Sequence, residues 1–144
     1  MSEEFKISQP GKKDKEQLMK LVKILYEDDP TNQIEKWDRD YSNYLPSTFV
    51  AEKNKQIVGY ICLGGGEKYV LIGDLCVLPE FRKIGIASKL IKRAIQKAIK
   101  QGKDYIRVDT HKDNKNSQSL YKKFGFEIVG ETPRGLYILH KKLK

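Results

Sequence analysis

Long apolar runs are missing from this sequence, and their absence excludes a membrane-spanning helix. No apolar segment approaches the ~18 uninterrupted residues that such a helix needs. The first residues, Met1 to Lys6, also lack the charged and then apolar pattern of a secretory signal. We therefore expect a cytoplasmic protein that has no membrane partner.

Cysteine is scarce, which limits covalent and metal-based stabilisation. The two cysteines, Cys62 and Cys76, lie in apolar runs and form neither a CxxC pair nor a cluster with histidine. This arrangement supports neither a disulfide framework nor a zinc site. We expect two core thiols and no bound metal.

Acidic residues are outnumbered, at 19 against 28 basic residues, so the net charge is +9. A basic chain can meet nucleic acid, an anionic membrane surface or a polyanionic cofactor, and charge alone does not choose among these. Internal repeats and low-complexity linkers are missing as well. Because 144 residues is a common size for one domain, we expect residues 1–144 to form a single domain.

Hydrophobic periodicity predicts an α/β chain that begins with a short strand around Phe5 and Ile7. Apolar runs bounded by turn residues predict further strands, and spacings of three to four residues predict helices. The expected strands are 48–52, 57–63, 69–77, 105–110, 126–130 and 136–140. The expected helices are 18–25, a weaker one over 32–44, 86–101 and 117–124. This order favours helices on both faces of a mixed sheet.

The most informative segment is the junction between the expected strand 69–77 and the expected helix 86–101. The first turn of a helix has unpaired N–H groups and the positive end of the helix dipole, so it favours a diphosphate. Gly85 has no side chain to block close approach, and Arg82 and Lys83 add positive charge. An ordinary strand-to-helix turn that contains a glycine is the alternative.

Two sequence blocks carry a family resemblance. Residues 74–87 spell Asp-Leu-x-Val-x-Pro-x-x-Arg-x-x-Gly-x-Ala, which resembles the signature of the GNAT superfamily of N-acetyltransferases. Residues 114–126 resemble the family's Asn-x-x-Ala-x-x-Leu-Tyr-x-x-x-Gly-Phe segment, with Ser117 in place of the alanine. Residues 10–46 match the family only in their helix pattern.

The resemblance implies the fold and the cosubstrate. The implied fold is α/β, with a mixed, mostly antiparallel central sheet of about seven strands, helices on both faces, and splayed parallel strands four and five. The cosubstrate is acetyl-coenzyme A, and the backbone N–H of Leu75 polarises the acetyl carbonyl. The implied contacts to the cosubstrate are Leu75, Cys76, Val77, Arg82, Lys83, Ile84, Gly85, Ile86, Ala87, Ser88, Asn114 and Tyr121.

The resemblance also implies catalytic roles. Tyr121 matches the family tyrosine near the coenzyme sulfur, where a phenol of pKa ~10 can protonate the leaving thiolate. The first choice for the base is Asp109, twelve residues before Tyr121, and the second is Asp74. An ordered water chain without a single base remains a third alternative. Without the family context, Tyr121 would be interpreted as a core aromatic and Asn114 as a helix cap.

The acceptor region is expected in the N-terminal third, where acidic residues at 27–29 adjoin an aromatic stripe of Trp37, Tyr41 and Tyr44. Such a wall suits a cationic amine, although the stripe could instead be core. We predict transfer of an acetyl group to a primary amine: a polyamine, a peptide N-terminus, a lysine or a small amine. The alternatives are a catalytically inactive coenzyme A-binding domain and a nucleic-acid-binding module. No specific nucleic acid partner is expected, and a homodimer is left open.

Overall fold

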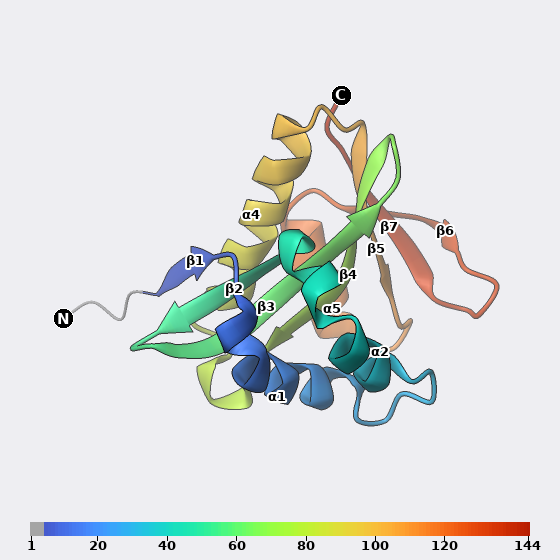
Figure 1. Cartoon of the computed structure of the whole chain (residues 1–144). Helices are drawn as coiled ribbons and strands as arrows, with labels where there is room; N and C mark the ends of the chain where they lie inside the picture. The colour runs from blue at the N-terminus through green and yellow to red at the C-terminus, as the bar shows by residue number, and fades with distance from the viewer. Residues whose placement is uncertain (1–4) are drawn as a thin grey trace. The chain divides into compact units, whose positions relative to one another are not determined.

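The computed structural model describes residues 5–144, whose contacts group the chain into two compact units (Figure 1). The first unit comprises Met1–Cys62 and Asp74–Arg93, and the second comprises Leu63–Gly73 and Ala94–Lys144. Residues 1–4 lie outside the described residues. They form most of the segment Met1 to Lys6, in which the sequence pattern predicts no secretory signal. The single domain over residues 1–144 stays a prediction. Among residues 5–144, no helix has both the length and the apolar character needed to cross a membrane.

Seven strands form one mixed sheet in the order β1-β2-β3-β4-β5-β7-β6. The pairing of β4 with β5 is parallel, whereas β1 with β2, β2 with β3, β5 with β7 and β6 with β7 are antiparallel. The mixed sheet with parallel strands four and five is therefore confirmed. The strands are β1 (Lys6–Ser8), β2 (Thr48–Lys53), β3 (Gln56–Gly65), β4 (Tyr69–Val77), β5 (Tyr105–Thr110), β6 (Glu127–Glu131) and β7 (Tyr137–Lys142).

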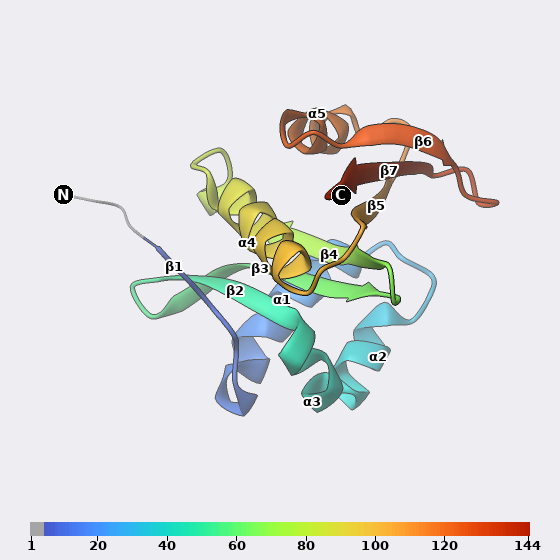
Figure 2. The same cartoon turned by 90° about the horizontal axis from the view of Figure 1, so that it is seen from above.

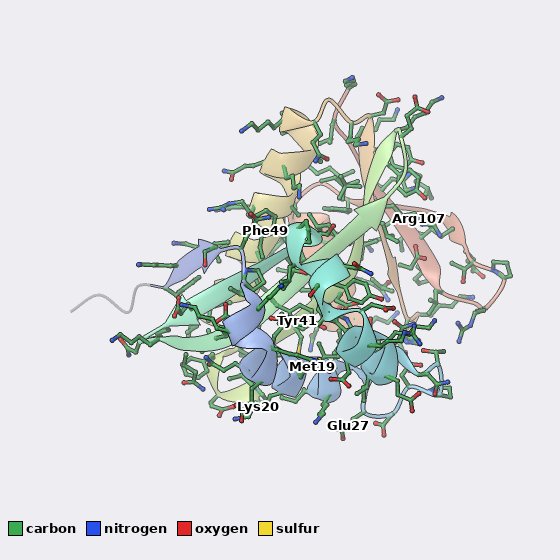
Figure 3. All side chains as sticks on the ribbon, viewed as in Figure 1. Met19, Lys20, Glu27, Tyr41, Phe49 and Arg107 are labelled. Atoms are coloured by element: carbon green, nitrogen blue, oxygen red, sulfur yellow. The ribbon has the colours of Figure 1, made fainter. Side chains whose placement is uncertain are left out.

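The first unit packs α1 (Lys15–Tyr26), α2 (Gln33–Arg39) and α3 (Tyr41–Tyr44) against β2 and β3. Leu18, Leu21 and Val22 recur at helical spacing in α1 and are fully buried, which is why this helix docks on the sheet. Figure 2 shows these helices on one side of β2 and β3, opposite the first half of α4 (Ile86–Lys100). Outside this core, Lys20 and Glu27 point away from it (Figure 3).

The single helix expected over residues 32–44 is wrong, because it is divided at Asp40. This residue has φ −106° and ψ 23°, outside the helical region, so α2 ends at Arg39 and α3 begins at Tyr41. The carboxylate of Asp40 accepts two hydrogen bonds from Arg39, at 3.2 and 3.0 Å. These bonds lie at the break between α2 and α3.

The second unit contains part of β4, the strands β5, β6 and β7, and α5 (Lys115–Lys123). Alternate residues of β5 are buried, namely Ile106, Val108 and Thr110, and Tyr121 of α5 is buried as well. On the other face of the strands, the ring of Tyr105 stacks on Tyr69 and His140, with centroid distances of 5.2 and 4.3 Å. Side-chain alternation along the strand therefore separates an apolar face from a polar and aromatic one.

Candidate active site

The loop before α4 has an open backbone at Gly85. Gly85 has φ +92°, and a Cβ placed on it would meet nothing within 4 Å. The space above the backbone is open, and a side chain at this φ would strain the turn. Arg82, Lys83 and Ile84 are exposed, with Lys83 also at positive φ (66°).

The first turn of α4 follows directly. Its first intrahelical bond joins Lys89 N to Gly85 O at 3.1 Å, so the N–H groups of Ile86, Ala87 and Ser88 precede any i−4 carbonyl within the helix. Ile86 is buried and anchors the turn, whereas Ala87 and Ser88 are half-buried. Unpaired N–H groups in the first turn of a helix can bind a diphosphate.

The end of β4 supplies the backbone that the sequence assigned to the pantetheine arm. Leu75 is half-buried, and Cys76 and Val77 are buried. The carbonyl of Val77 already accepts a 2.9 Å bond from Arg82 Nε, which fixes this arginine at the start of the loop. Arg82 therefore has a structural contact that the sequence did not predict.

Both cysteines are buried and neither belongs to a disulfide among residues 5–144, which confirms the prediction of core thiols. Burial raises the pKa of Cys76 to about 11, and the nearby charge of Arg82 opposes only part of that rise. The thiolate that nucleophilic catalysis needs is thus disfavoured at neutral pH. Among residues 5–144, no group of three or more His, Cys, Asp and Glu side chains could hold a metal ion.

Asp74 lies in a buried cluster within the first unit. Its Oδ2 accepts a 2.9 Å bond from Trp37 Nε1 and a 2.8 Å bond from the Tyr60 hydroxyl, and its Oδ1 accepts a bond from the Tyr26 hydroxyl. Burial raises the pKa of Asp74, and the hydrogen bonds from its three donors oppose that rise. None of these three donors is a cation, so it is neutral hydrogen bonds that oppose the effect of burial on this carboxyl group.

The two tyrosines of this cluster remain protonated. Burial, followed by the charge of Asp74, raises the pKa of both Tyr26 and Tyr60 far above the usual value. Sequence reasoning missed both residues as partners of Asp74. The available signal was an aspartate within an otherwise apolar strand, because a carboxylate is rarely buried without hydrogen-bond donors.

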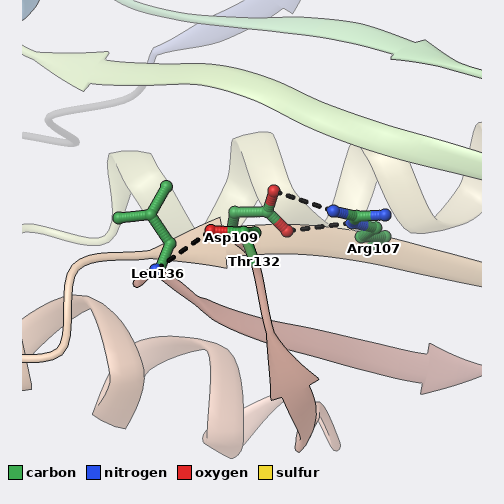
Figure 4. A network of polar contacts seen from close by, with 4 residues as sticks. All are labelled: Arg107, Asp109, Thr132 and Leu136. Carbon is green, nitrogen blue, oxygen red and sulfur yellow. Dashed lines mark hydrogen bonds and ion pairs between the residues drawn. The ribbon is translucent and has the colours of Figure 1, made fainter. Parts of the chain in front are cut away.

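Asp109 lies on β5 in the second unit and is held by a neighbour on the same strand. Arg107 donates from Nε and Nη2 to the two carboxylate oxygens at 2.9 and 3.0 Å (Figure 4). The side chains of Arg107 and Asp109 are 30% and 25% exposed, so Asp109 is more accessible than Asp74. Burial and the charge of Arg107 lower the pKa of His140, the cross-strand partner of Arg107.

Tyr121 and Asn114 both belong to the α5 region of the second unit. Tyr121 is 4% exposed, and its ring packs edge-on against Phe126 at 5.3 Å. Burial raises its pKa, so the phenol stays protonated. Asn114 caps α5, since its side-chain oxygen accepts a 3.2 Å bond from Ser117 N. The cap explains why α5 begins at Lys115, earlier than the expected start at residue 117.

The residues expected to form the acceptor wall lie partly in the core and partly on the surface. Trp37 and Tyr41 are buried in the core of the first unit, and Tyr44 packs on Trp37 with a centroid distance of 4.5 Å. The core alternative therefore describes this stripe. Figure 3 labels Tyr41 of the stripe. Of the acidic residues, 27 and 28 are exposed and the carboxylate at 29 accepts bonds from Thr31.

The model for the acetyltransferase (GNAT) family matches residues 16–126, which span both sequence blocks. This chain belongs to the GNAT acetyltransferase family. The structure of Arabidopsis thaliana Naa50 in complex with the bisubstrate analogue CoA-Ac-MVNAL is 28% identical, with a TM-score of 0.78, and the match covers 96% of this chain and 99% of that one.

Two curated relatives of this GNAT chain match over part of its length. GCN5-related N-acetyltransferase 6, chloroplastic, of Arabidopsis thaliana is 39% identical over 57% of this chain and 29% of its own length. An uncharacterised N-acetyltransferase of Methanocaldococcus jannaschii is 33% identical over 64% of this chain and 46% of its own length. The chain thus spans less than half the length of the curated relatives it matches.

Proposed function

We propose that this GNAT protein transfers an acetyl group from acetyl-coenzyme A directly to a primary amine. The observation that carries the proposal is the open backbone at Gly85, directly before the first turn of α4 and beside the exposed cations Arg82 and Lys83. A turn of this kind fits the pyrophosphate of coenzyme A. Family membership supports the same cosubstrate.

The cosubstrate would meet backbone at two places. Residues 82–88 would hold the pyrophosphate through main-chain N–H groups and positive charge, and residues 75–77 would pair with the pantetheine arm, with the Leu75 N–H polarising the acetyl carbonyl. When bound, acetyl-coenzyme A supplies the activated acyl group. Asn114 would donate its side-chain N–H to the arm, because its oxygen is already used in the cap of α5.

We assign the base to Asp109 and the acid to Tyr121. Each oxygen of Asp109 accepts one bond from Arg107 and keeps a lone pair for the amine proton. In contrast, Oδ2 of Asp74 already accepts two bonds inside the core, which favours a role in positioning Tyr26 and Tyr60. The buried, protonated phenol of Tyr121 suits proton donation to the departing thiolate.

The acceptor class to test first is the N-terminal amine of a peptide. Support comes from the Naa50 structure, whose bisubstrate analogue CoA-Ac-MVNAL joins coenzyme A to a peptide. Polyamines, lysine side chains and small amines remain the other acceptors. A panel of these amines with acetyl-coenzyme A, followed by free thiol release, identifies the acceptor. Absence of thiol release with every amine, together with an unchanged melting temperature at saturating coenzyme A, would refute the function.

Two substitutions separate the acid from the base. Tyr121→Phe keeps the ring against Phe126 and should lower turnover about a hundredfold to ten-thousandfold at every pH. Asp109→Asn should lose activity at neutral pH and recover it as the pH rises, because the amine then deprotonates unaided. Asp104→Asn, an exposed aspartate in a weak 3.7 Å pair with Lys144, is the control and should match the wild type. Full activity in Tyr121→Phe would remove the acid role.

The net charge of +9 makes nucleic-acid binding the competing function to test. Any protein so basic binds DNA weakly at low salt, so only binding that survives physiological salt counts. Oligonucleotide binding that persists under this condition, without thiol release from any amine, would replace the acetyltransferase with a nucleic-acid-binding module.

A further inference from the structure

A buried hydroxyl on β5 has no hydrogen-bond partner. Among residues 5–144, Thr110 Oγ1 is the only buried side-chain nitrogen or oxygen atom in this condition. Thr110 is 6% exposed and is the last residue of β5. Native structures satisfy most buried polar groups, so a hydroxyl without a partner is an observation that needs an explanation.

The strand around Thr110 is paired on one side only. The parallel pairing of β5 with β4 ends at Val108 and Ile72, two residues before the end of β5. On the other side, the pairing with β7 continues through Thr110 and its partner Tyr137. At Thr110, β5 is therefore paired with β7 and no longer with β4.

Helix α5 covers the end of β5 within the second unit. The buried side chain of Gln118 donates to the carbonyls of His111 and Lys112, at 2.9 and 3.0 Å, and so fixes α5 over the residues that follow Thr110. Tyr121, which is also buried, lies one turn further along the same helix.

We propose that Thr110 is a ligand-contacting residue whose hydroxyl forms a hydrogen bond with an amide group of the pantetheine arm. This inference rests on the proposed function. The pantetheine arm has amide groups, which can both donate to and accept from a threonine hydroxyl. Thr110 shares its unit with Tyr121, the residue assigned to the sulfur end of that arm, and not with the Gly85 loop assigned to the pyrophosphate. The bond would replace the partner that the free protein lacks.

The test compares two ligands and two variants by titration calorimetry. Thr110→Val keeps the shape and deletes the hydroxyl, whereas Thr110→Ser keeps the hydroxyl and serves as the control. Coenzyme A contains the arm, and 3′-phosphoadenosine 5′-diphosphate carries the same phosphates without it. Thr110→Val should weaken coenzyme A binding about 3- to 10-fold and leave the nucleotide unchanged, and Thr110→Ser should bind both like the wild type.

Chemical unfolding of the free protein distinguishes a ligand-binding role of the Thr110 hydroxyl from a purely structural one. An unsatisfied hydroxyl contributes nothing to the free fold, so Thr110→Val should be as stable as the wild type or more stable. A buried water as the partner would instead make Thr110→Val less stable and leave coenzyme A affinity unchanged, which overturns the proposal. Equal weakening of both ligands would also overturn it. Wild-type protein that binds neither ligand would refute the proposed function itself.

Discussion

Replacing Tyr60 by Phe tests whether the buried carboxylate of Asp74 is stabilised by neutral donors. The substitution keeps the ring, which packs edge-on against Trp37 at 5.6 Å and 85°, and deletes the hydroxyl that lies 2.8 Å from Asp74 Oδ2. A hydrogen bond to a charged group contributes about 1.5–3 kcal/mol, so the free energy of unfolding should fall by about that amount. Tyr41→Phe is the matched control, because its hydroxyl donates to the neutral carbonyl of Gly11 at 2.8 Å and should cost about 0.5–1.5 kcal/mol.

The cost of Tyr60→Phe should depend on pH. The folded-state pKa of Asp74 is raised, so the folded protein binds its proton more firmly and this group's contribution to stability falls as pH rises through that pKa. Without the Tyr60 donor the folded-state pKa of Asp74 rises further, so the fall in stability becomes larger and extends to higher pH. Urea unfolding from about pH 4 to about pH 9 measures this slope, and Asp74→Asn should remove it. The reasoning is refuted if Tyr60→Phe costs no more than Tyr41→Phe and shows no pH dependence.

The remaining predictions concern the cosubstrate loop and the thiol beside it. Gly85→Ala should lower the free energy of unfolding by about 1–2 kcal/mol, because φ at this position is +92°. The same variant should bind coenzyme A more weakly in calorimetry. Unchanged affinity would show that the pyrophosphate does not bind at this loop. The rise in melting temperature caused by coenzyme A should shrink between about 50 mM and about 500 mM salt, whereas a salt-independent rise would contradict phosphate binding at Arg82 and Lys83. Cys76→Ala should keep turnover, since burial raises the thiol pKa to about 11, and loss of thiol release in a folded variant would point to a covalent route.

Elements whose signals are local could be predicted closely from the sequence. The bounds of β4 and β5 agree with the expected 69–77 and 105–110, because apolar alternation begins and ends at turn residues there. Helix α4 begins at Ile86 as expected, since its apolar stripe starts directly after Gly85. The position of the turn between β4 and α4 could be predicted for the same reason, because the strand end, Gly85 and the helix start lie within a few residues of one another.

The cluster around Asp74 could not be predicted, because its donors are far from it in the sequence. The hydroxyls of Tyr60 and Tyr26 come from 14 and 48 residues away, and the indole of Trp37 from 37 residues away. Periodicity shows that Trp37 faces inward but does not say which strand it meets. Sheet register decides that, and register depends on pairings between distant segments.

Asp109 and Thr110 show how a local pattern can suffice for one residue and fail for its neighbour. Alternation along β5 places Arg107 on the same face as Asp109, two residues away, so their ion pair could have been predicted from the strand alone. The same alternation places Thr110 on the buried face with Val108, where a threonine hydroxyl usually finds a partner. Whether it does depends on where the pairing between β4 and β5 ends and on how α5 is fixed over the strand end by Gln118. Both are tertiary features, so the unsatisfied hydroxyl becomes visible only in the folded chain.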